Sequence, residues 1–263
     1  MTAQLLFDSH AHYDDPRFDS DRESFLSAPE QHGVLGFVNV GTDLLSSKLG
    51  VAYSQRHKNI YCSVGVHPSC VPGLPADYLV LLEDLSRAPK AIAIGEIGLD
   101  YHLDVDAKSR KDQCKFFEEQ LALAQQLELP VIIHSRDAKE DTMAVLGNMK
   151  PKSFVLHCFS YDLATMERVC DLGGFLSFTG VVTFKNAVDS RAVLAAVPAD
   201  RLLLETDSPY MAPEPYRGQR CDSSFLRYIA ACFAGTRNVS FTEMVATLNG
   251  NAERLFGITL DCQ

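Results

Sequence analysis

Eight short apolar runs alternate with stretches of helical pattern along the 263 residues of this sequence. Most of the runs are apolar throughout, as parallel strands are when both faces of their sheet are covered. No linker, low-complexity segment or long block of charge divides the series, so we expect a single domain over residues 1–263. The expected strands are Leu5–Ser9, Leu35–Val40, Ile60–Val66, Ala91–Glu96, Pro130–His134, Phe154–His157, Gly174–Phe178 and Leu202–Glu205.

The segments between these runs have the periodicity of helices. Two of the expected helices occupy 163–172 and 191–197. In another, four apolar residues share one face at steps of four, three and three: Phe117, Leu121, Ala124 and Leu127. Eight successive β-α units predict an α/β fold of the (β/α)8 TIM-barrel type. The main alternative is an open doubly wound sheet, but no Gly-x-Gly-x-x-Gly follows the first strand, which disfavours a dinucleotide-binding version.

The charge of the chain restricts how it could meet nucleic acid. The formal net charge is −10, and proteins that coat long nucleic acids need many Lys and Arg side chains facing phosphates. A nuclease is not excluded, because bound metal ions supply local positive charge in an acidic protein.

The sequence also indicates the cellular setting. It has no apolar run near the ~20 residues that span a membrane and no pattern of a signal peptide, so we expect a soluble, cytoplasmic protein without a membrane partner. No obligate protein partner is evident. The eight Cys form no Cys-x-x-Cys, and free thiols are expected rather than disulfides or a zinc knuckle.

Ligand-type side chains follow the expected strands. His10 and His12 are one strand repeat apart, so both point to one face while the small Ala11 points away. Five of the eight His lie at strand ends, where catalytic residues of a barrel gather. Taken singly, each residue has a structural alternative, such as a helix cap at Asp207.

Together, four imidazoles and two carboxylates make a suitable ligand set for two divalent ions. Glu96 comes from mid-barrel and could bridge the ions, while Asp207 on the last strand would share the ion of the first strand and take a proton from water. Nitrogen with carboxylate oxygen suits zinc, manganese or iron, and more carboxylate and water would suit magnesium. The set is His10, His12, Glu96, His134, His157 and Asp207.

These motifs resemble, in order and over nearly the whole chain, the TatD family of metal-dependent deoxyribonucleases. Related amidohydrolases with His-x-His usually bridge their metals with a modified lysine, whereas the fourth strand here supplies Glu96. The matching stretches are 7–12, 65–68, 95–101, 130–136, 157–159 and 205–210, with the helix containing Gln113, Phe117 and Gln120 and the closing 251–256.

The resemblance implies a TIM-barrel phosphodiesterase, typically a 3′-to-5′ exonuclease on single-stranded DNA ends, that uses magnesium or a similar ion. It implies that His10, His12, Glu96 and Asp207 hold one ion. Glu96, His134 and His157 would hold the other, and Asp207 and Glu96 would be the catalytic carboxylates. It further suggests that His67 and Arg136 contact the substrate phosphate.

The chain departs from the family pattern in two loops that could border the substrate. Ser160-Tyr161 stands where the family usually has Ser or Thr and then Gly, and 221–223 lacks the usual Asn and Pro. Neither departure removes a proposed ligand. Three aromatic residues beside the motifs are candidates for stacking on bases or for packing at the rim: Tyr101, Phe159 and Tyr210.

Three other functions were weighed against the nuclease. A metal-dependent hydrolase of amide or ester bonds, such as an aminoacyl-ester deacylase, would use the same ligands. A non-catalytic scaffold is disfavoured by the complete ligand set. A Ser or Cys nucleophile has little support, since no Gly-x-Ser-x-Gly is present and Cys158 fits the end of a strand.

Overall fold

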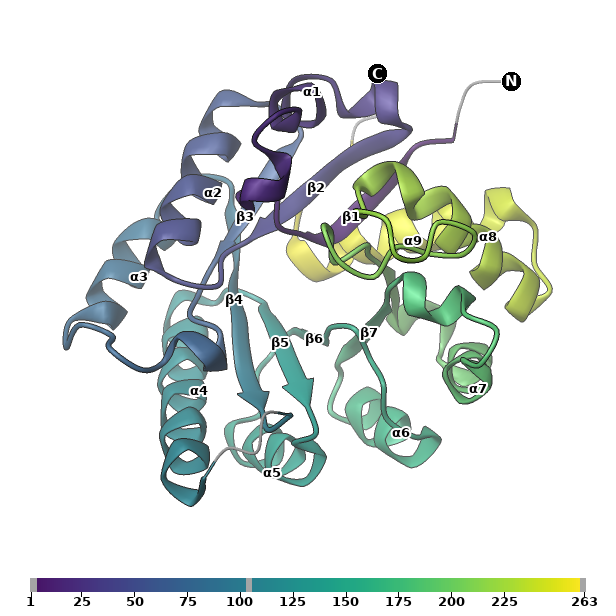
Figure 1. Ribbon diagram of the computed structural model, residues 1–263. Helices are drawn as coiled ribbons and strands as arrows, with labels where there is room; N and C mark the ends of the chain where they lie inside the picture. The colour runs from purple at the N-terminus through teal and green to yellow at the C-terminus, as the bar shows by residue number, and fades with distance from the viewer. Residues whose placement is uncertain (1–3, 103–105, 261–263) are drawn as a thin grey trace.

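The computed structural model describes residues 4–102 and 106–260 and has eight parallel strands that pair in chain order. The helices lie outside this nearly closed barrel (Figure 1), so the expected TIM-barrel architecture is confirmed. The strands are β1 Leu6–Ala11, β2 Val34–Val40, β3 Ile60–Val64, β4 Ala91–Asp100, β5 Val131–Arg136, β6 Phe154–Leu156, β7 Phe175–Phe178 and β8 Leu202–Leu204. The helices are α1 Arg22–Ser27, α2 Leu44–Arg56, α3 Tyr78–Ser86, α4 Ala107–Leu127, α5 Lys139–Met149, α6 Leu163–Asp171, α7 Val188–Ala196, α8 Leu226–Arg237 and α9 Phe241–Phe256.

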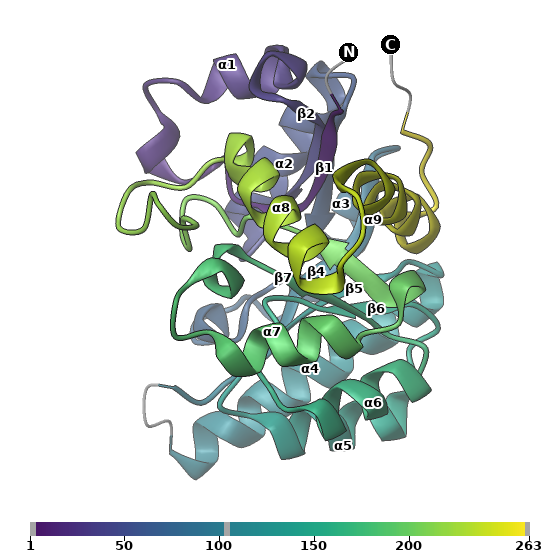
Figure 2. The same ribbon diagram turned by 90° about the vertical axis from the view of Figure 1, so that its right-hand side faces the viewer.

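All eight expected strands are present, and their ends differ by up to four residues. β4 continues to Asp100 because it stays paired with β5 as far as the Asp100–Arg136 pair. β3 stops at Val64 instead of Val66, since the backbone of Val66 bonds to a side chain of α4. β4 and β5 point away from the end of the barrel at which the first and last described residues lie (Figures 1 and 2).

An apolar core inside the barrel underlies the polar strand ends. Its members include Ile132, Val155 and Leu203, each two residues before a polar strand-end residue and therefore on the same face. The last turns of α9 pack against this cluster through Leu255 and Phe256. The polar residues that follow thus lie directly above a buried apolar layer.

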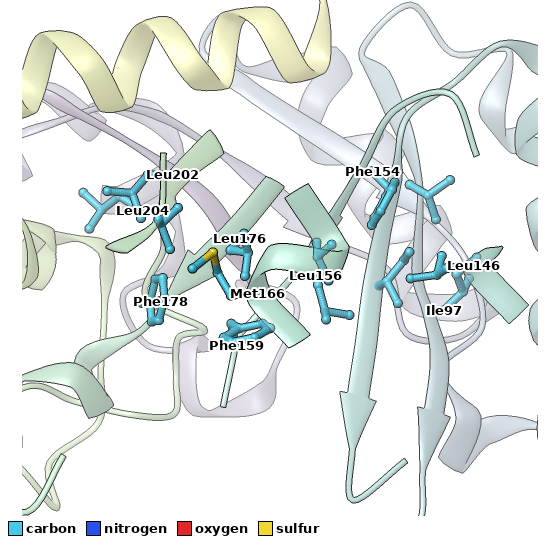
Figure 3. Close-up of a cluster of buried hydrophobic side chains, with 14 of the residues drawn as sticks. Ile97, Leu146, Phe154, Leu156, Phe159, Met166, Leu176, Phe178, Leu202 and Leu204 are labelled. Atoms are coloured by element: carbon cyan, nitrogen blue, oxygen red, sulfur yellow. The ribbon is translucent and has the colours of Figure 1, made fainter. Parts of the chain in front are cut away.

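A larger core fills the space between the sheet and its helices. Figure 3 shows part of it, with Met166 of α6 beside Leu176 and near the rings of Phe159 and Phe178. The two rings meet edge to face with their centroids 6.1 Å apart, a favourable geometry for aromatic pairs. This core fixes β6, β7 and β8 against the helices that follow them.

The barrel closes between β1 and β8 mainly through side chains. Asp8 is fully buried, and its Oδ1 accepts a hydrogen bond from the Thr206 backbone N–H at 3.0 Å. Its Oδ2 accepts from the hydroxyls of Thr206 at 2.6 Å and Ser223 at 2.7 Å. Burial raises the pKa of Asp8 to about 7 although these hydrogen bonds oppose the shift. Beyond Asp8, backbone bonds from Asp207 to His10 and from His12 to Ser208 complete the seam.

Two buried glutamines of α4 brace the loops after β3 and β4. Gln120 accepts from the N–H of Val66 at 2.8 Å and donates to its carbonyl at 3.1 Å. Gln113, seven residues earlier and on the same helix face, makes the same pair of bonds with Asp100 at 2.9 and 3.0 Å. Each amide makes the two backbone hydrogen bonds that a neighbouring strand would otherwise make. One helix therefore positions two segments at the mouth of the barrel.

The remaining expectations about cysteines and membranes can be compared with the structure. The seven cysteines between residues 4 and 260 are free thiols, as expected, and Cys262 lies outside the described residues. Cys158 does not lie inside β6 as expected: it follows the strand with φ +45°, where the chain turns into the pocket described below. Within the described part of the chain, none of the helices has the length and apolarity to cross a membrane.

We expect the substitution Asp8→Ala to lower the free energy of unfolding by about 3 kcal/mol, because it leaves buried donors of Thr206 and Ser223 without their acceptor. Equilibrium urea denaturation followed by circular dichroism measures this change. Asp77→Ala is the matched control, since Asp77 is exposed and its side chain makes no capping bond. A loss under about 0.5 kcal/mol for Asp8→Ala, the range of ordinary surface changes, would contradict the proposed closure.

Candidate metal centre

Glu96 occupies the centre of a cluster of imidazoles at the mouth of the barrel. It lies at an irregularity in the register of β4, which turns its buried side chain inward. Its Oε1 is 2.8 Å from Nδ1 of His134 and 2.8 Å from Nε2 of His157. Its Oε2 is 3.4 Å from Nε2 of His10 and 3.8 Å from Nε2 of His12. The two oxygens therefore face two different pairs of nitrogen donors.

Asp207 adds a second carboxylate on the side of β1. Its Oδ1 lies 3.4 Å from Nε2 of His12 and 3.7 Å from Nε2 of His10. The backbone of Asp207 is left-handed, with φ +57°, a conformation that Asp tolerates better than most residues. Its N–H donates to the carbonyl of His10 at 2.9 Å, so the barrel seam itself places this carboxylate beside the histidines of β1.

The second ring nitrogens of His12 and His134 also meet polar partners. Nδ1 of His12 lies 2.9 Å from the carbonyl of Val40, and Nε2 of His134 lies 3.1 Å from Oδ2 of Asp100. Nδ1 of His157 is 3.7 Å from the buried carboxylate of Glu205, too long for a hydrogen bond. Partners of this kind orient imidazoles toward metals.

The burial of these charges shifts their pKa values. Burial disfavours the anion of Glu96, but the imidazoles around it outweigh burial and hold the pKa of Glu96 well below its usual range. Burial likewise disfavours the cation of His12, yet Asp207 and Glu96 raise the pKa of His12 to about 9. Glu96 and Glu205 similarly overcome burial and raise the pKa of His157 well above its usual value.

The residues present fit divalent metal ions. Ligand atoms of His10, His12 and Glu96 lie within 4.8 Å of one another, as do those of His67, Glu96 and His134. Nε2 of His10 and Nε2 of His12 lie only 3.1 Å apart, and both face the carboxylates of Glu96 and Asp207, so these nitrogens converge on one point. Buried imidazoles and carboxylates converging on shared points are the donor set of zinc, manganese and iron sites.

The structure places His67 closer to the centre than a contact to substrate alone requires. Its Nε2 is 3.9 Å from Oε1 of Glu96, and burial lowers the pKa of His67 to about 4. A neutral imidazole in this position can accept a proton, ligate an ion or bond to a phosphate. The expectation of a phosphate contact stays a prediction.

Arg136 is exposed at the mouth of the barrel, one residue after Ser135. Its guanidinium makes no ion pair within residues 4–102 and 106–260. The end of β5 that carries it, with the turn that follows, is fixed by Tyr161, whose hydroxyl lies 2.8 Å from the Ser135 hydroxyl and accepts from the Ala138 N–H at 3.3 Å. The sequence departure at Tyr161 thus braces the two sides of Arg136.

The other departure does not border the pocket. Ser223 is buried in the barrel seam, where its hydroxyl donates to Asp8, and Asp222 accepts from the N–H of Ser224 at the start of a short 3-10 helix. The stretch 221–223 therefore lies in the barrel seam, through a contact between residues 215 positions apart, and the expectation that this loop could border the substrate stays a prediction.

The metal-ligand candidates border an open pocket of about 590 Å³. Its β3–β5 side carries His67, Asp100 and Arg136, while its β7–β8 side carries apolar residues such as Val181 and Met211. All eight residues predicted from the sequence as site residues lie at this pocket or directly beneath it. Those that line it are His12, His67, Glu96, His134, Arg136, His157 and Asp207, and His10 is fully buried behind Glu96.

A family profile described as "TatD related DNase" matches residues 7–257. The chain belongs to the TatD family of metal-dependent hydrolases. It is 37% identical over 257 residues to the uncharacterized metal-dependent hydrolase YabD of Bacillus subtilis, covering 97% of this chain and all of YabD. It is 33% identical over 262 residues to the 3'-5' ssDNA/RNA exonuclease TatD of Pantoea ananatis, covering 96% of this chain and all of that protein.

Solved structures of TatD relatives have the same barrel. The crystal structure of YJJV, a TatD homolog from Escherichia coli K12, matches with a TM-score of 0.91 at 30% sequence identity, covering 98% of this chain and all of YJJV. An uncharacterized amidohydrolase from Saccharomyces cerevisiae matches with a TM-score of 0.82 at 18% identity, covering 96% of this chain and 99% of that one, a likeness of fold alone.

Two carboxylates of this TatD centre were not predicted from the sequence to have a role. Asp100 contacts His134, and Glu205 accepts from the N–H of Cys158 at 2.7 Å and from the hydroxyl of Ser177 at 2.6 Å. Both stand in the strand-end motifs that carry the family resemblance. A ligand-type residue at a strand end was therefore a usable signal, but its histidine partner depends on the fold.

We expect metal binding at pH 7.5 to release protons, because the raised pKa values of His12, His134 and His157 favour their protonated forms and an ion needs neutral imidazoles. The apparent affinity should accordingly increase as the pH rises through about 9, the pKa of His12. Calorimetric titration with zinc or manganese in buffers of different ionisation enthalpy counts the protons. His12→Ala should remove one of them and His32→Ala, distant from the centre, none; zero release by the unaltered protein would refute the predicted charge state.

Proposed function

We propose that the protein is a 3′-to-5′ exonuclease on single-stranded DNA that uses two divalent metal ions. The observation that carries the proposal is the position of Glu96, whose two oxygens face separate groups of imidazoles as a bridging carboxylate would. The TatD relative from Pantoea ananatis, which is named as a 3'-5' ssDNA/RNA exonuclease, supports the choice of substrate. Divalent ions held by these residues would supply Lewis acidity for hydrolysis of a phosphodiester.

In this proposal, each ion has its own protein ligands. His10, His12, Asp207 and Oε2 of Glu96 would hold one ion. His134, His157 and Oε1 of Glu96 would hold the other. The metal is proposed to be magnesium, as is typical of the family, but the high share of imidazole donors makes manganese and zinc necessary comparisons.

Asp207 is the proposed general base. Its carboxylate lies at the pocket wall, and His10, His12 and His157 outweigh its burial to lower the pKa of Asp207, so that it is ionised and able to accept a proton from water. His12, 3.4 Å from Oδ1 of Asp207, keeps the carboxylate in place. A base held in this way contributes roughly 10²- to 10⁴-fold to the rate.

Arg136 and His67 are the proposed contacts to the substrate phosphate. Arg136 lies at the pocket edge, where its guanidinium has no ion pair with the residues that the structure describes, and a guanidinium binds phosphate with two parallel hydrogen bonds. His67 borders the same side of the pocket. A cation here favours an anionic substrate over the neutral amides of the alternative hydrolase function.

One assay tests both the substrate and the role of Asp207. It measures release of label from single-stranded DNA labelled at its 3′ or 5′ end, in magnesium, manganese, zinc or chelator. We expect the 3′ label to leave first, the chelator to abolish release, and Asp207→Asn to reduce the rate at least about 100-fold. The control Asp77→Asn, at an exposed position outside the pocket, should not change the rate.

Two results would reject parts of this function. Release of the 5′ label first would reverse the polarity. Intact DNA in every metal, from a protein that binds the ions, would reject the nuclease and direct the assays to amide and ester substrates.

The phosphate contact is tested separately with Arg136→Ala, which should raise KM for an oligonucleotide about 10- to 100-fold, since hydrogen bonds to charged groups contribute about 1.5–3 kcal/mol. Arg136→Lys should recover part of the loss by restoring the charge without the planar fork. Tyr161→Phe removes only the hydroxyl that fixes the loop and should raise KM less, with metal affinity retained. Arg56→Ala, on the outer helix α2, is the control; equal KM for the Arg136 and Arg56 variants would exclude the contact.

A further inference from the structure

The pocket has an exposed apolar edge that the proposed chemistry does not use. Six large apolar side chains are exposed among the described residues, and two of them, Tyr210 and Met211, are neighbours in the chain. Both line the pocket, with 46% and 41% of their surfaces exposed. With Val181, which lines the pocket beside them, they form what we call the apolar rim.

The ring of Tyr210 is fixed in place although it is exposed. Its backbone N–H donates to the carbonyl of Asp207 at 2.9 Å, which ties the rim to the proposed base. The guanidinium carbon of Arg17 lies 4.2 Å from the ring centroid, and Arg17 is itself held by Asp15 at 2.8 Å. A ring that is already ordered loses little conformational entropy when a ligand stacks on it.

The segments that carry Val181 and Met211 are also held in place by close contacts with each other. Gly180 begins the 3-10 helix Gly180–Thr183 that carries Val181, and a Cβ at Gly180 would lie 2.0 Å from the carbonyl oxygen of Met211. Only glycine allows the two segments to approach so closely. The hydroxyl of Thr183 accepts from the N–H of Glu214 at 2.8 Å, which joins the segments again beyond the contact.

The apolar rim and the side of the pocket that carries His67 and Arg136 follow different strands of the barrel. Val181 follows β7 and Tyr210 follows β8, whereas His67 follows β3 and Arg136 ends β5. Because the strands pair in chain order around the barrel, β7 and β8 lie across from β3 and β4, and β5, which carries Arg136, is three strands from β8. A ligand that spans the pocket from β5 to β8 therefore meets Arg136 at one end and the apolar rim at the other.

We propose that the apolar rim is a nucleobase subsite, in which one base of a single strand stacks on Tyr210 and packs against Met211 and Val181. This inference rests on the proposed function, since the phosphate beside that base would lie over the metal centre with Arg136 at its far side. Stacking uses the π-face that every base has, so the subsite accepts any base and selects unpaired strands, whose bases are free to stack.

The subsite is tested by binding as well as turnover. In the Asp207→Asn background with magnesium, fluorescence anisotropy gives Kd for a single-stranded oligonucleotide and for the same strand with abasic residues at its 3′ end. The Kd of the Asp207→Asn protein for the abasic strand should be at least about tenfold higher than its Kd for the complete strand, within the range measured for one stacked base. Tyr210→Ala should weaken binding of the complete strand by a similar factor and bind the abasic strand without a further loss, because both changes remove one interaction.

Two further variants make the test specific. Tyr210→Phe keeps the ring and should recover most of the affinity, while Leu163→Ala, which changes a similarly exposed apolar residue on α6, should not alter Kd. Circular dichroism and thermal unfolding establish that each variant is folded.

The outcomes separate the subsite from the function on which it rests. If the unaltered protein digests single-stranded DNA but the abasic and Tyr210→Ala losses simply add, the rim is not a base subsite and the nuclease function stands. If the protein neither binds nor digests oligonucleotides, the nuclease function fails and the subsite fails with it. Losses that do not add, with recovery by Tyr210→Phe, support the subsite.

Discussion

The centre of this TatD-family protein depends on a carboxylate surrounded by histidines. Glu96 is buried, and the partners described for it are imidazoles that burial alone would keep neutral. A buried anion is costly unless it is paired or bound to a metal. The pKa shifts follow from this pairing: His157, His10 and His134 hold the pKa of Glu96 well below its usual range, and Glu96 in turn raises the pKa of His12 and His157, so that these two imidazoles favour their protonated forms. Divalent ions bound here would compensate the negative charge of Glu96 in place of the protons on these imidazoles.

The geometry around Glu96 depends in turn on how the barrel closes. Asp207 follows β8 and His12 follows β1, far apart in the sequence, and backbone bonds from Asp207 to His10 and from His12 to Ser208 bring them together. Asp8 fixes the seam from below with hydrogen bonds to Thr206 and Ser223. The polar groups that close the barrel and those that form the centre are thus successive residues of the same strands.

Much of the fold and the site could be predicted because their signals are local. Each strand is an apolar run, and each ligand candidate stands at or near the end of one, so period and position were enough to find both. What sequence did not reveal depends on contacts between distant segments: the pairing that extends β4, the loop of Ser223 drawn into the seam, the Tyr161 hydroxyl beside Ser135. Of three aromatic residues considered for stacking, Tyr101 and Phe159 are buried and Tyr210 is exposed, a difference decided by tertiary packing.

The paired amides of α4 have a consequence for how such a pocket can change. Gln113 and Gln120 hold the main chains of Asp100 and Val66, so the placing of these two segments does not depend on their own side chains. The side chain of Asp100 has a separate role, because its carboxylate contacts Nε2 of His134. Helix α4 therefore positions the main chain at the end of β4 and after β3. A barrel built in this way can acquire a new substrate by altering the side chains of one wall, while the metal-ligand candidates on the neighbouring strands keep their geometry.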